Sequence, residues 1–403
     1  MTTTTAEREQ RIALATLTWA ADFPDRHLIS LLTSLSPVNV LTVIRTGALP
    51  DGHELPELAA RHLSRAASAL PYWRKRLQEA PADGGIEDAA RHGFRLVCPG
   101  DRGWPATLYE LGPGRPCALW VSGADLPAPG TAVAIDGTRA ASAYGSYVAA
   151  RIAGDLAGDD VPIISGGAYG IDAAAHRAAL AAGGSTVAVV ANGPGVPHPA
   201  GHADLMEAIA TSGGSVVTEQ PPGRLATRLR YTHRSRLIAA LGSGAVIVEA
   251  SARSSGMRTA QYAQELGRPV MAVPGPVTSD RATGCHELIR AGAALVTSAA
   301  DVRSAITARI HRQATAQTPA EVWVLRHEDT HGDAISVHAS EEAALAALAS
   351  TCRSRWDNAA GADGVPPTGT ELDDATAVAI YFEQRHGIES YRIWSCAVEG
   401  ARP

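Results

Sequence analysis

A buried strand, a glycine turn and a helix, in that order, restrict the fold of this chain more than any other stretch. Residues 161–182 read VPIISGGAYGIDAAAHRAALAA, where an apolar run ends at Ser165, Gly166 and Gly167 and a helical pattern follows. Glycines let the backbone turn sharply, and the free N–H groups of the next helix favour an anion. The stretch predicts a phosphate-binding turn or, alternatively, a buried turn of a parallel sheet without a ligand.

Strands and helices alternate from Ala132 onwards. The predicted strands are Ala132–Ile135, Pro162–Ile164, Thr186–Val190, Ser215–Val217, Ala245–Val248, Val270–Val273 and Ala294–Val296. Such alternation is typical of a parallel sheet covered by helices on both faces, with ligands beyond the carboxyl ends of the strands. The glycine turns fall at these ends. We therefore predict an α/β fold, an extended Rossmann-like doubly wound sheet.

Two smaller regions flank this sheet. Residues 1–85 have a helical pattern with breaks at prolines and glycine, which predicts an N-terminal helical domain. We interpret it as a packing or dimerisation cap, because no basic hairpin of a DNA-binding module is visible. Residues 86–310 are assigned to the Rossmann-like domain. After a polar linker, Gln313–Pro319, residues 320–403 are predicted to form a small α+β domain of unknown role.

Charge and composition restrict the class of protein. The formal net charge is -6 over 403 residues, so attraction to nucleic acid requires a local basic patch. There is no run of about 18 apolar residues and no signal-peptide pattern, so we expect a cytoplasmic protein without membrane contact. The five cysteines are scattered, which argues against zinc and against disulfides. We expect no cofactor.

Such a basic patch occurs at residues 224–236, RLATRLRYTHRSR. This stretch contains five arginines, two aromatic rings and no acid. Arginines neutralise phosphates and a flat ring stacks on a base, which is how proteins bind single strands without sequence preference. The alternative is an arginine-rich surface, or arginines paired internally with Glu219 and Glu249. Arg139 follows a strand and a glycine, so we expect it in the crevice where a phosphate lies.

An ordered set of motifs carries a resemblance to a known family. The motifs are GTRAAS from Gly137, SGGAYGIDAAAH from Ser165, HRSRLIAAL from His233, VEASARSSGMRTAQYAQELGRPVMAVPG from Val248 and TGCHELIRAGA from Thr283. Over about residues 101–301 the chain resembles the DprA/Smf family, the DNA-processing protein A of natural transformation. The resemblance implies an extended Rossmann domain that protects incoming single-stranded DNA, forms a homodimer and loads the RecA recombinase.

The resemblance and the basic stretch together predict the site residues. The candidates for DNA or phosphate binding are Gly137, Thr138, Arg139, Ser165, Gly166, Gly167, Tyr169, Arg230, Arg234, Arg236, Ser255 and Gly256. The sequence alone does not locate the dimer interface, but the helix expected around Cys285–Ala291, with Leu288 and Ile289 adjacent, offers an apolar patch on which to centre it. A chain that ends near Ile310 is expected to stay dimeric and to keep most of its affinity for single strands.

Several residues depart from the family pattern. Asp136 replaces an apolar residue before the first glycine, and unless paired its carboxylate repels phosphate. Ala140 and Tyr169 replace basic residues, Ser235 replaces an asparagine, and His202 and His286 stand where asparagines are common. These changes motivate an alternative: a nucleotide-sensing or nucleoside-monophosphate-cleaving Rossmann protein, or a paralogue used in phage defence.

We expect no catalytic residue. Glu249, with Ser255, Gly256 and Thr259, resembles a nucleotide-cleaving turn, but a carboxylate at a strand end is more often a structural cap, and no nucleophile-base pair or metal cluster accompanies it. Asp172 is expected to cap the following helix, and His176, four residues on, to pack or to hydrogen-bond on the same face. The chain has no Walker lysine, which argues against ATP hydrolysis.

Overall fold

The structure is a computed structural model that describes residues 5–21, 24–49, 55–317, 321–329, 332–358, 372–384 and 390–397. The chain forms two compact units, Met1–Arg309 and Ile310–Pro403, and helix α13 (Ala299–Gln317) contains the division between them. The expected linker is wrong for residues 313–317, which continue α13 because alanine and glutamine favour a helix. Residues 318–319 lie outside the described residues.

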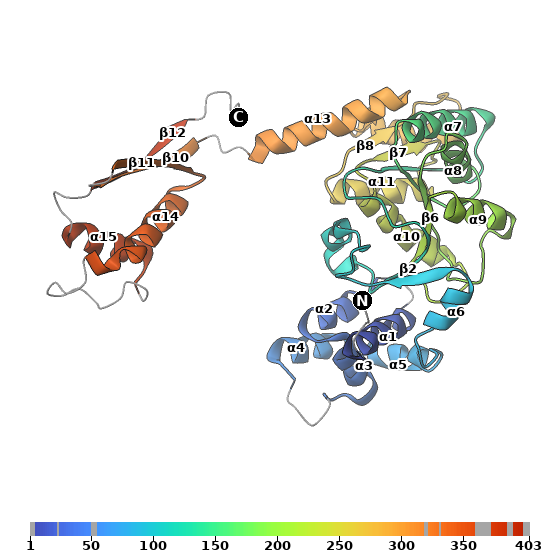
Figure 1. Ribbon diagram of the computed structural model, residues 1–403. Coiled ribbons are helices and arrows are strands. Elements are labelled where there is room, and N and C mark those ends of the chain that lie inside the picture. The colour runs from blue at the N-terminus through green and yellow to red at the C-terminus, as the bar shows by residue number, and fades with distance from the viewer. Residues whose placement is uncertain are drawn as a thin grey trace. The chain divides into compact units, whose positions relative to one another are not determined.

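The first unit is built on a nine-stranded sheet (Figure 1). Its strands are β1 (Phe94–Val97), β2 (Leu119–Gly123), β3 (Val133–Gly137), β4 (Ile163–Gly166), β5 (Thr186–Val189), β6 (Ser215–Thr218), β7 (Ala245–Val248), β8 (Val270–Ala272) and β9 (Ala294–Leu295). The order is β1-β2-β6-β5-β4-β3-β7-β8-β9. The seven strands β3 to β9 are parallel to one another. Strands β1 and β2 extend the sheet beyond β6 in antiparallel pairing. The predicted doubly wound fold is confirmed.

Helices cover both faces of this sheet. One face packs on α7 (Ala143–Gly158), α8 (Ile171–Ala181), α9 (Ala203–Thr211) and α13. The other packs on α10 (Arg228–Leu241), α11 (Ser255–Glu265) and α12 (Thr283–Arg290). Cys285 and Leu288 of α12 are buried in this second core. The dimer patch expected there is therefore wrong for these two residues, because the sheet already covers them.

Helices also form the predicted N-terminal region, from Thr5 to Arg91. They are α1 (Thr5–Ala20), α2 (Arg26–Ser34), α3 (Pro37–Thr46), α4 (Glu57–Arg65), α5 (Leu70–Leu77) and α6 (Ile86–Arg91). Asp25 caps α2 by accepting from the N–H groups of His27 and Leu28, and Gly47, at a φ of 86°, ends α3. Among the described helices none alone is long and apolar enough to span a membrane; α2 and α3, bent by 120°, reach that limit only when counted together.

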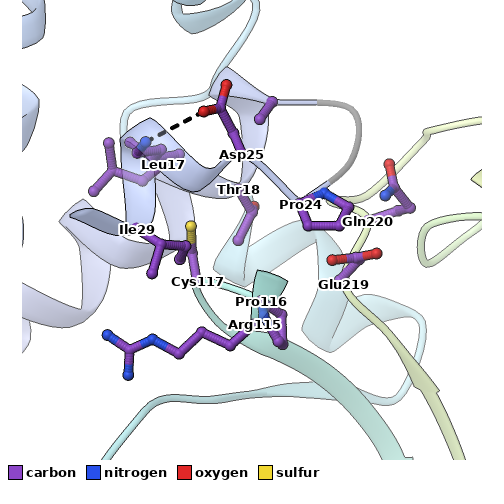
Figure 2. A pocket seen from close by; sticks show the side chains of 12 residues that line it. Leu17, Thr18, Pro24, Asp25, Ile29, Arg115, Pro116, Cys117, Glu219 and Gln220 are labelled. Atoms are coloured by element: carbon purple, nitrogen blue, oxygen red, sulfur yellow. Dashed lines mark hydrogen bonds between the residues drawn. The ribbon is translucent and has the colours of Figure 1, made fainter. Parts of the chain in front are cut away.

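Direct contacts join the helical region to the sheet. Arg11 pairs with Asp101 at 2.8 Å and donates to the Leu96 carbonyl of β1 at 2.7 Å. Figure 2 shows a small cavity at this junction, with Asp25 and Glu219 among its lining residues. Its volume of about 20 Å³ holds about one water molecule, so it is part of the packing rather than a ligand site.

The second unit is a small α+β structure. Strands β10 (Glu321–Asp329), β11 (Gly332–His338) and β12 (Ser390–Ala397) form an antiparallel sheet in the order β11-β10-β12. Helices α14 (Glu341–Ser354) and α15 (Asp374–Gln384) contribute Leu348 and Tyr381 to its core. This agrees with the predicted fold class, while most of the expected loop at 358–370 lies outside the described residues.

Candidate nucleic-acid interface

The connections of the sheet change direction between β3 and β7. From β3 the chain winds through β4 and β5 to β6 on one side, and then α10 returns it to β7 on the other side of β3. Ligands of doubly wound sheets bind in the crevice at such a switch point. A cleft of about 1200 Å³ opens here, lined by residues 137–140 after β3, 226–228, 231 and 232 around the start of α10, and 251–255 after β7.

The charged side chains that line this cleft are all positive. Among the described residues that line it, four are arginines and none is acidic: Arg139, Arg228, Arg253 and Arg258. All four are exposed. The guanidinium carbon of Arg139 lies 4.1 Å from the ring centroid of Tyr231, a cation–π contact that holds the charge at the cleft wall. The cleft therefore attracts anions although the chain as a whole is acidic.

Helices α7 and α11 both begin near this cleft, and they differ in what their first N–H groups meet. At α7 the carboxylate of Glu249 accepts from the backbone N–H of Ser142 at 2.8 Å and from its hydroxyl at 2.5 Å. The expectation that Glu249 is a structural cap is confirmed. At α11 the first turn has neither an acidic residue nor a side-chain cap, and the Ser254 hydroxyl at the cleft has no hydrogen-bond partner among the described residues. The start of α11 is thus open to an anion.

Glycine is required where β3 ends. A Cβ on Gly137 would overlap the carbonyl oxygen of Val248, because β3 and β7 pair directly beside it. A Cβ on Gly256 would come within 3.3 Å of the Gly137 Cα, so α11 can begin close to the strand end. Ser255 and Thr138 then line the cleft. Of the predicted site residues, Gly137, Thr138, Arg139 and Ser255 meet here, with Gly256 packed behind them.

The second predicted turn, Ser165–Gly167, is filled by protein groups. A Cβ on Gly166 would overlap the guanidinium of Arg234 and the carboxylate of Asp172. The Ser165 hydroxyl donates to the Ile135 carbonyl at 2.6 Å. None of the three turn residues lines the cleft. Gly166 therefore makes room for a buried ion pair.

Tyr169 and the two histidines near this turn lie outside the cleft lining. Tyr169 is exposed, and its ring lies edge-on to that of His202, with centroids 4.4 Å apart. Tyr231 lines the cleft, whereas Tyr169 does not. His176 is buried with Nδ1 2.7 Å from the Thr186 hydroxyl, as expected of a packed histidine. Burial lowers the pKa of His176 to about 3, so it stays neutral.

Three predicted arginines of α10 are buried. Arg234 donates to the Val189 carbonyl at 3.1 Å and lies 3.5 Å from Asp172, beneath the cleft and against Tyr231. Arg236 makes two bonds to Glu219, at 2.8 and 2.5 Å, and donates to the Gly114 carbonyl. Arg230 donates to the Leu225 carbonyl. None of the three lines the cleft, and the internal pairing with Glu219 raised as an alternative is present.

Two buried carboxylates flank Arg234. Asp136 accepts from the N–H of Gly137 at 2.7 Å and from the Thr259 hydroxyl at 2.5 Å, so it is paired and does not line the cleft. Burial raises its pKa. The pKa of Asp172 rises to about 7, because burial and the charge of Asp136 outweigh the attraction of Arg234. Asp172 accepts from the N–H of Ala168 and so caps the turn before α8. The expectation that it caps the start of the helix is wrong, because its carboxylate faces this turn and Arg234 instead.

Sequence reasoning missed two cleft arginines, Arg253 and Arg258, and did not select Arg228 from the basic stretch. A signal for all three was available, because each lies in or near a segment that follows a strand of the sheet: Arg253 in the loop after β7, Arg258 in the first turn of α11, and Arg228 at the start of α10. Arg234 and Arg236 were predicted as site residues because they match the family pattern, and this pattern does not distinguish buried from exposed arginines.

A doubly wound sheet with a basic cleft at its switch point places this chain in the class of Rossmann-like proteins. The family model of the DNA recombination-mediator protein A matches residues 95–307. DNA processing protein DprA of Mycobacterium tuberculosis is 44% identical over 305 residues, which cover 72% of this chain and 73% of that protein. Protein Smf of Escherichia coli is 37% identical over 196 residues, 49% of this chain and 52% of that protein. The chain belongs to the DprA/Smf family, as its motifs predicted.

A solved structure agrees with this assignment. The X-ray structure of DNA processing protein A from Streptococcus pneumoniae matches with a TM-score of 0.57 and 27% identity. The match covers 73% of this chain and 97% of that one. Together with the family model, it extends the relationship beyond the motifs to the fold of the first unit.

Proposed function

We propose that this chain binds single-stranded DNA, without strong sequence preference, in the cleft at the carboxyl ends of β3 and β7. The observation that carries the proposal is a lining with four exposed arginines and no acid among its described residues. Arginines neutralise backbone phosphates, and a guanidinium plane offers a stacking surface to an unpaired base. Arg139, held against Tyr231, is placed to do both.

The proposed roles of the predicted residues differ by position. Gly137, Thr138, Arg139 and Ser255 contact the strand, together with Arg228, Arg253 and the open start of α11. Arg234 and the Ser165–Gly167 turn support the floor of the cleft. Arg236 ties α10 to Glu219 and to the segment before β2. Lining the cleft is what separates the first group from the other two.

A competition titration tests the proposal. Full-length protein is titrated into labelled single-stranded DNA by fluorescence anisotropy at several salt concentrations, with single strands, duplex and mononucleotides as competitors. We expect single strands to compete best and log affinity to fall linearly with log salt, by about 0.7 for each phosphate contacted. Preference for a mononucleotide, or binding independent of salt, contradicts the proposal and favours a nucleotide-sensing role.

We further propose that the protein acts as a homodimer that passes DNA to the RecA recombinase during recombination or natural transformation. Membership of a recombination-mediator family supports this role. Two clefts in one dimer make the second DNA contact effectively intramolecular. Light scattering on the full chain and RecA filament assembly on coated DNA test it. A monomer, or filament assembly no faster with the protein than without, contradicts it.

A further inference from the structure

A second pocket lies on the other side of the β5–α9 connection from the cleft. Its volume is about 440 Å³, within the range of about 300–1000 Å³ common for small-molecule sites. The segment from α6 to β1, the loop after β5 and helix α9 form its walls. His198 lines both this pocket and the cleft, and its ring centroid is 5.9 Å from that of Tyr231. The two spaces therefore meet at one side chain.

The walls of the pocket suit an uncharged, flat group better than a phosphate. Phe94, Val190 and Met206 supply apolar surface. The one arginine of its described lining, Arg91, is already paired with Asp88 at 2.7 Å, and Glu207 adds a negative charge. A phosphate here would lack a free cation and face a carboxylate.

The buried amide of Asn192 points to a ligand. Asn192 is only 6% exposed and lines the pocket, and its Nδ2 donates to the Gly193 carbonyl at 3.2 Å. Its Oδ1 accepts no hydrogen bond from any described residue. A buried acceptor without a partner is costly, so the site is complete only when a donor enters. An amide beside apolar walls is the chemistry that reads the edge of a nucleobase.

We propose that this pocket, referred to here as the Asn192 pocket, receives one base of the DNA strand whose phosphates lie in the cleft. The inference rests on the proposed function and deepens it: the arginines hold the backbone, and His198 marks where a base turns from the cleft toward Asn192. The amide of Asn192 then accepts from the exocyclic amine or ring N–H of that base.

Oligonucleotides with and without bases test the proposal. Full-length protein is titrated with a single strand of mixed sequence and with the same strand carrying abasic sites, by fluorescence anisotropy at several salt concentrations. Two variants alter the pocket: Asn192→Ala removes the amide, and Thr211→Trp fills the pocket from an exposed position on α9. Ser212→Trp, an exposed neighbour that does not line the pocket, is the matched control.

We expect both pocket variants to bind the base-bearing strand about tenfold more weakly, the scale of one lost base contact. Their affinity for the abasic strand and their salt slope should equal those of the wild type, because no phosphate contact changes. Ser212→Trp should match the wild type on both strands. Thermal unfolding confirms that each variant is folded, and the exposed Thr211 position keeps the test valid if Asn192→Ala is unstable.

Three outcomes overturn the inference. In the first, the pocket variants bind both strands as tightly as the wild type. In the second, they lose the same affinity for the base-bearing and the abasic strand. In the third, free deoxynucleosides need Asn192 for binding, whereas the affinity for DNA strands does not depend on Asn192. In each case a normal salt slope leaves the proposed function intact. Failure of the wild type to bind any strand is a different result, because it contradicts the proposed function itself.

Discussion

Arginines occupy two contrasting environments on either side of Tyr231. Arg139 lies in the cleft with an exposed side chain, whereas Arg234 lies beneath it, buried against the same ring and 3.5 Å from Asp172. The residue type is the same, but the exposed guanidinium is available to a ligand and the buried one neutralises carboxylates. Burial, rather than arginine content, therefore separates an arginine that is open to a ligand from one that supports the fold.

The largest expected effect comes from removing the buried charge. Arg234→Met leaves Asp136 and Asp172 without their cation in a dry interior, and breaking a buried pair costs about 3–5 kcal/mol. Arg228→Met, at an exposed position on the same helix, should change the free energy of unfolding by less than about 0.5 kcal/mol. Urea unfolding at pH 8 measures both. Equal losses for the two variants would erase the distinction between the environments.

The next effect is a pH dependence of stability. The pKa of Asp172 rises from its ordinary value of 3.8 to about 7 in the folded protein, so the folded state binds a proton that the unfolded state has released. This contribution is fully present below about pH 4 and is lost as pH rises toward 7, by up to about 1.4 kcal/mol per pH unit.

The Asp172→Asn variant isolates that contribution. Its free energy of unfolding, measured in urea from pH 4 to pH 8, should lack the decline that the wild type shows between about pH 4 and pH 7. The difference between the two proteins removes the opposite contribution of half-buried carboxylates such as Asp83. Burial alone would raise the pKa of Asp83, but backbone hydrogen bonds from Glu87 and Gly85 outweigh it and lower this pKa. Parallel stability curves for the two proteins would mean that Asp172 is ionised throughout.

A smaller effect is expected for the exposed member of the comparison. Arg139→Ala should reduce affinity for all single strands alike, by about tenfold, and lower the salt slope by about 0.7, one phosphate contact. Its free energy of unfolding should stay within about 0.5 kcal/mol of the wild type. In contrast, Arg234→Ala should leave the salt slope unchanged wherever it is folded, since a buried guanidinium releases no counterion. A slope change in Arg234→Ala alone reverses the assignment.

The sequence predicts the sheet well because parallel strands are short apolar runs with helices between them, and β7, for example, begins and ends where expected. It also predicts that the glycines after β3 and β4 lie at the ligand edge. It does not distinguish their uses, because a turn that admits a phosphate and a turn that admits Arg234 both require a residue without Cβ. That distinction depends on Arg234 of α10, which comes 62 residues after its partner Asp172 in the chain.

The antiparallel edge was equally hard to foresee. Strands β1 and β2 have the composition of any buried strand, and their direction follows only from the pairing of β2 with β6 and of β1 with β2. The Asn192 pocket depends on this edge, since Phe94 and Ser122 come from β1 and β2. The Asn192 pocket thus depends on long-range strand pairing, which no local sequence motif predicts.

The smallest expected effect concerns the second unit. Its core, with Leu348, Trp356 and Tyr381, is separate from the cores of the first unit, and all described residues that line the cleft or the Asn192 pocket precede α12's end at Arg290. A chain that ends at Gln317 keeps α13 whole, including Val302, which packs on the sheet. We expect this shortened chain to bind single strands within about twofold of the full chain, with the same salt slope, because no residue that lines the cleft is removed. Light scattering should show the same oligomeric state for both chains. The thermal unfolding of the first unit should also be unchanged.

Two outcomes would contradict this prediction. A monomeric shortened chain beside a dimeric full chain would show that the second unit, rather than the sheet, carries the assembly. A large loss of affinity with the oligomeric state unchanged would show that the second unit contributes its own arginines to DNA binding.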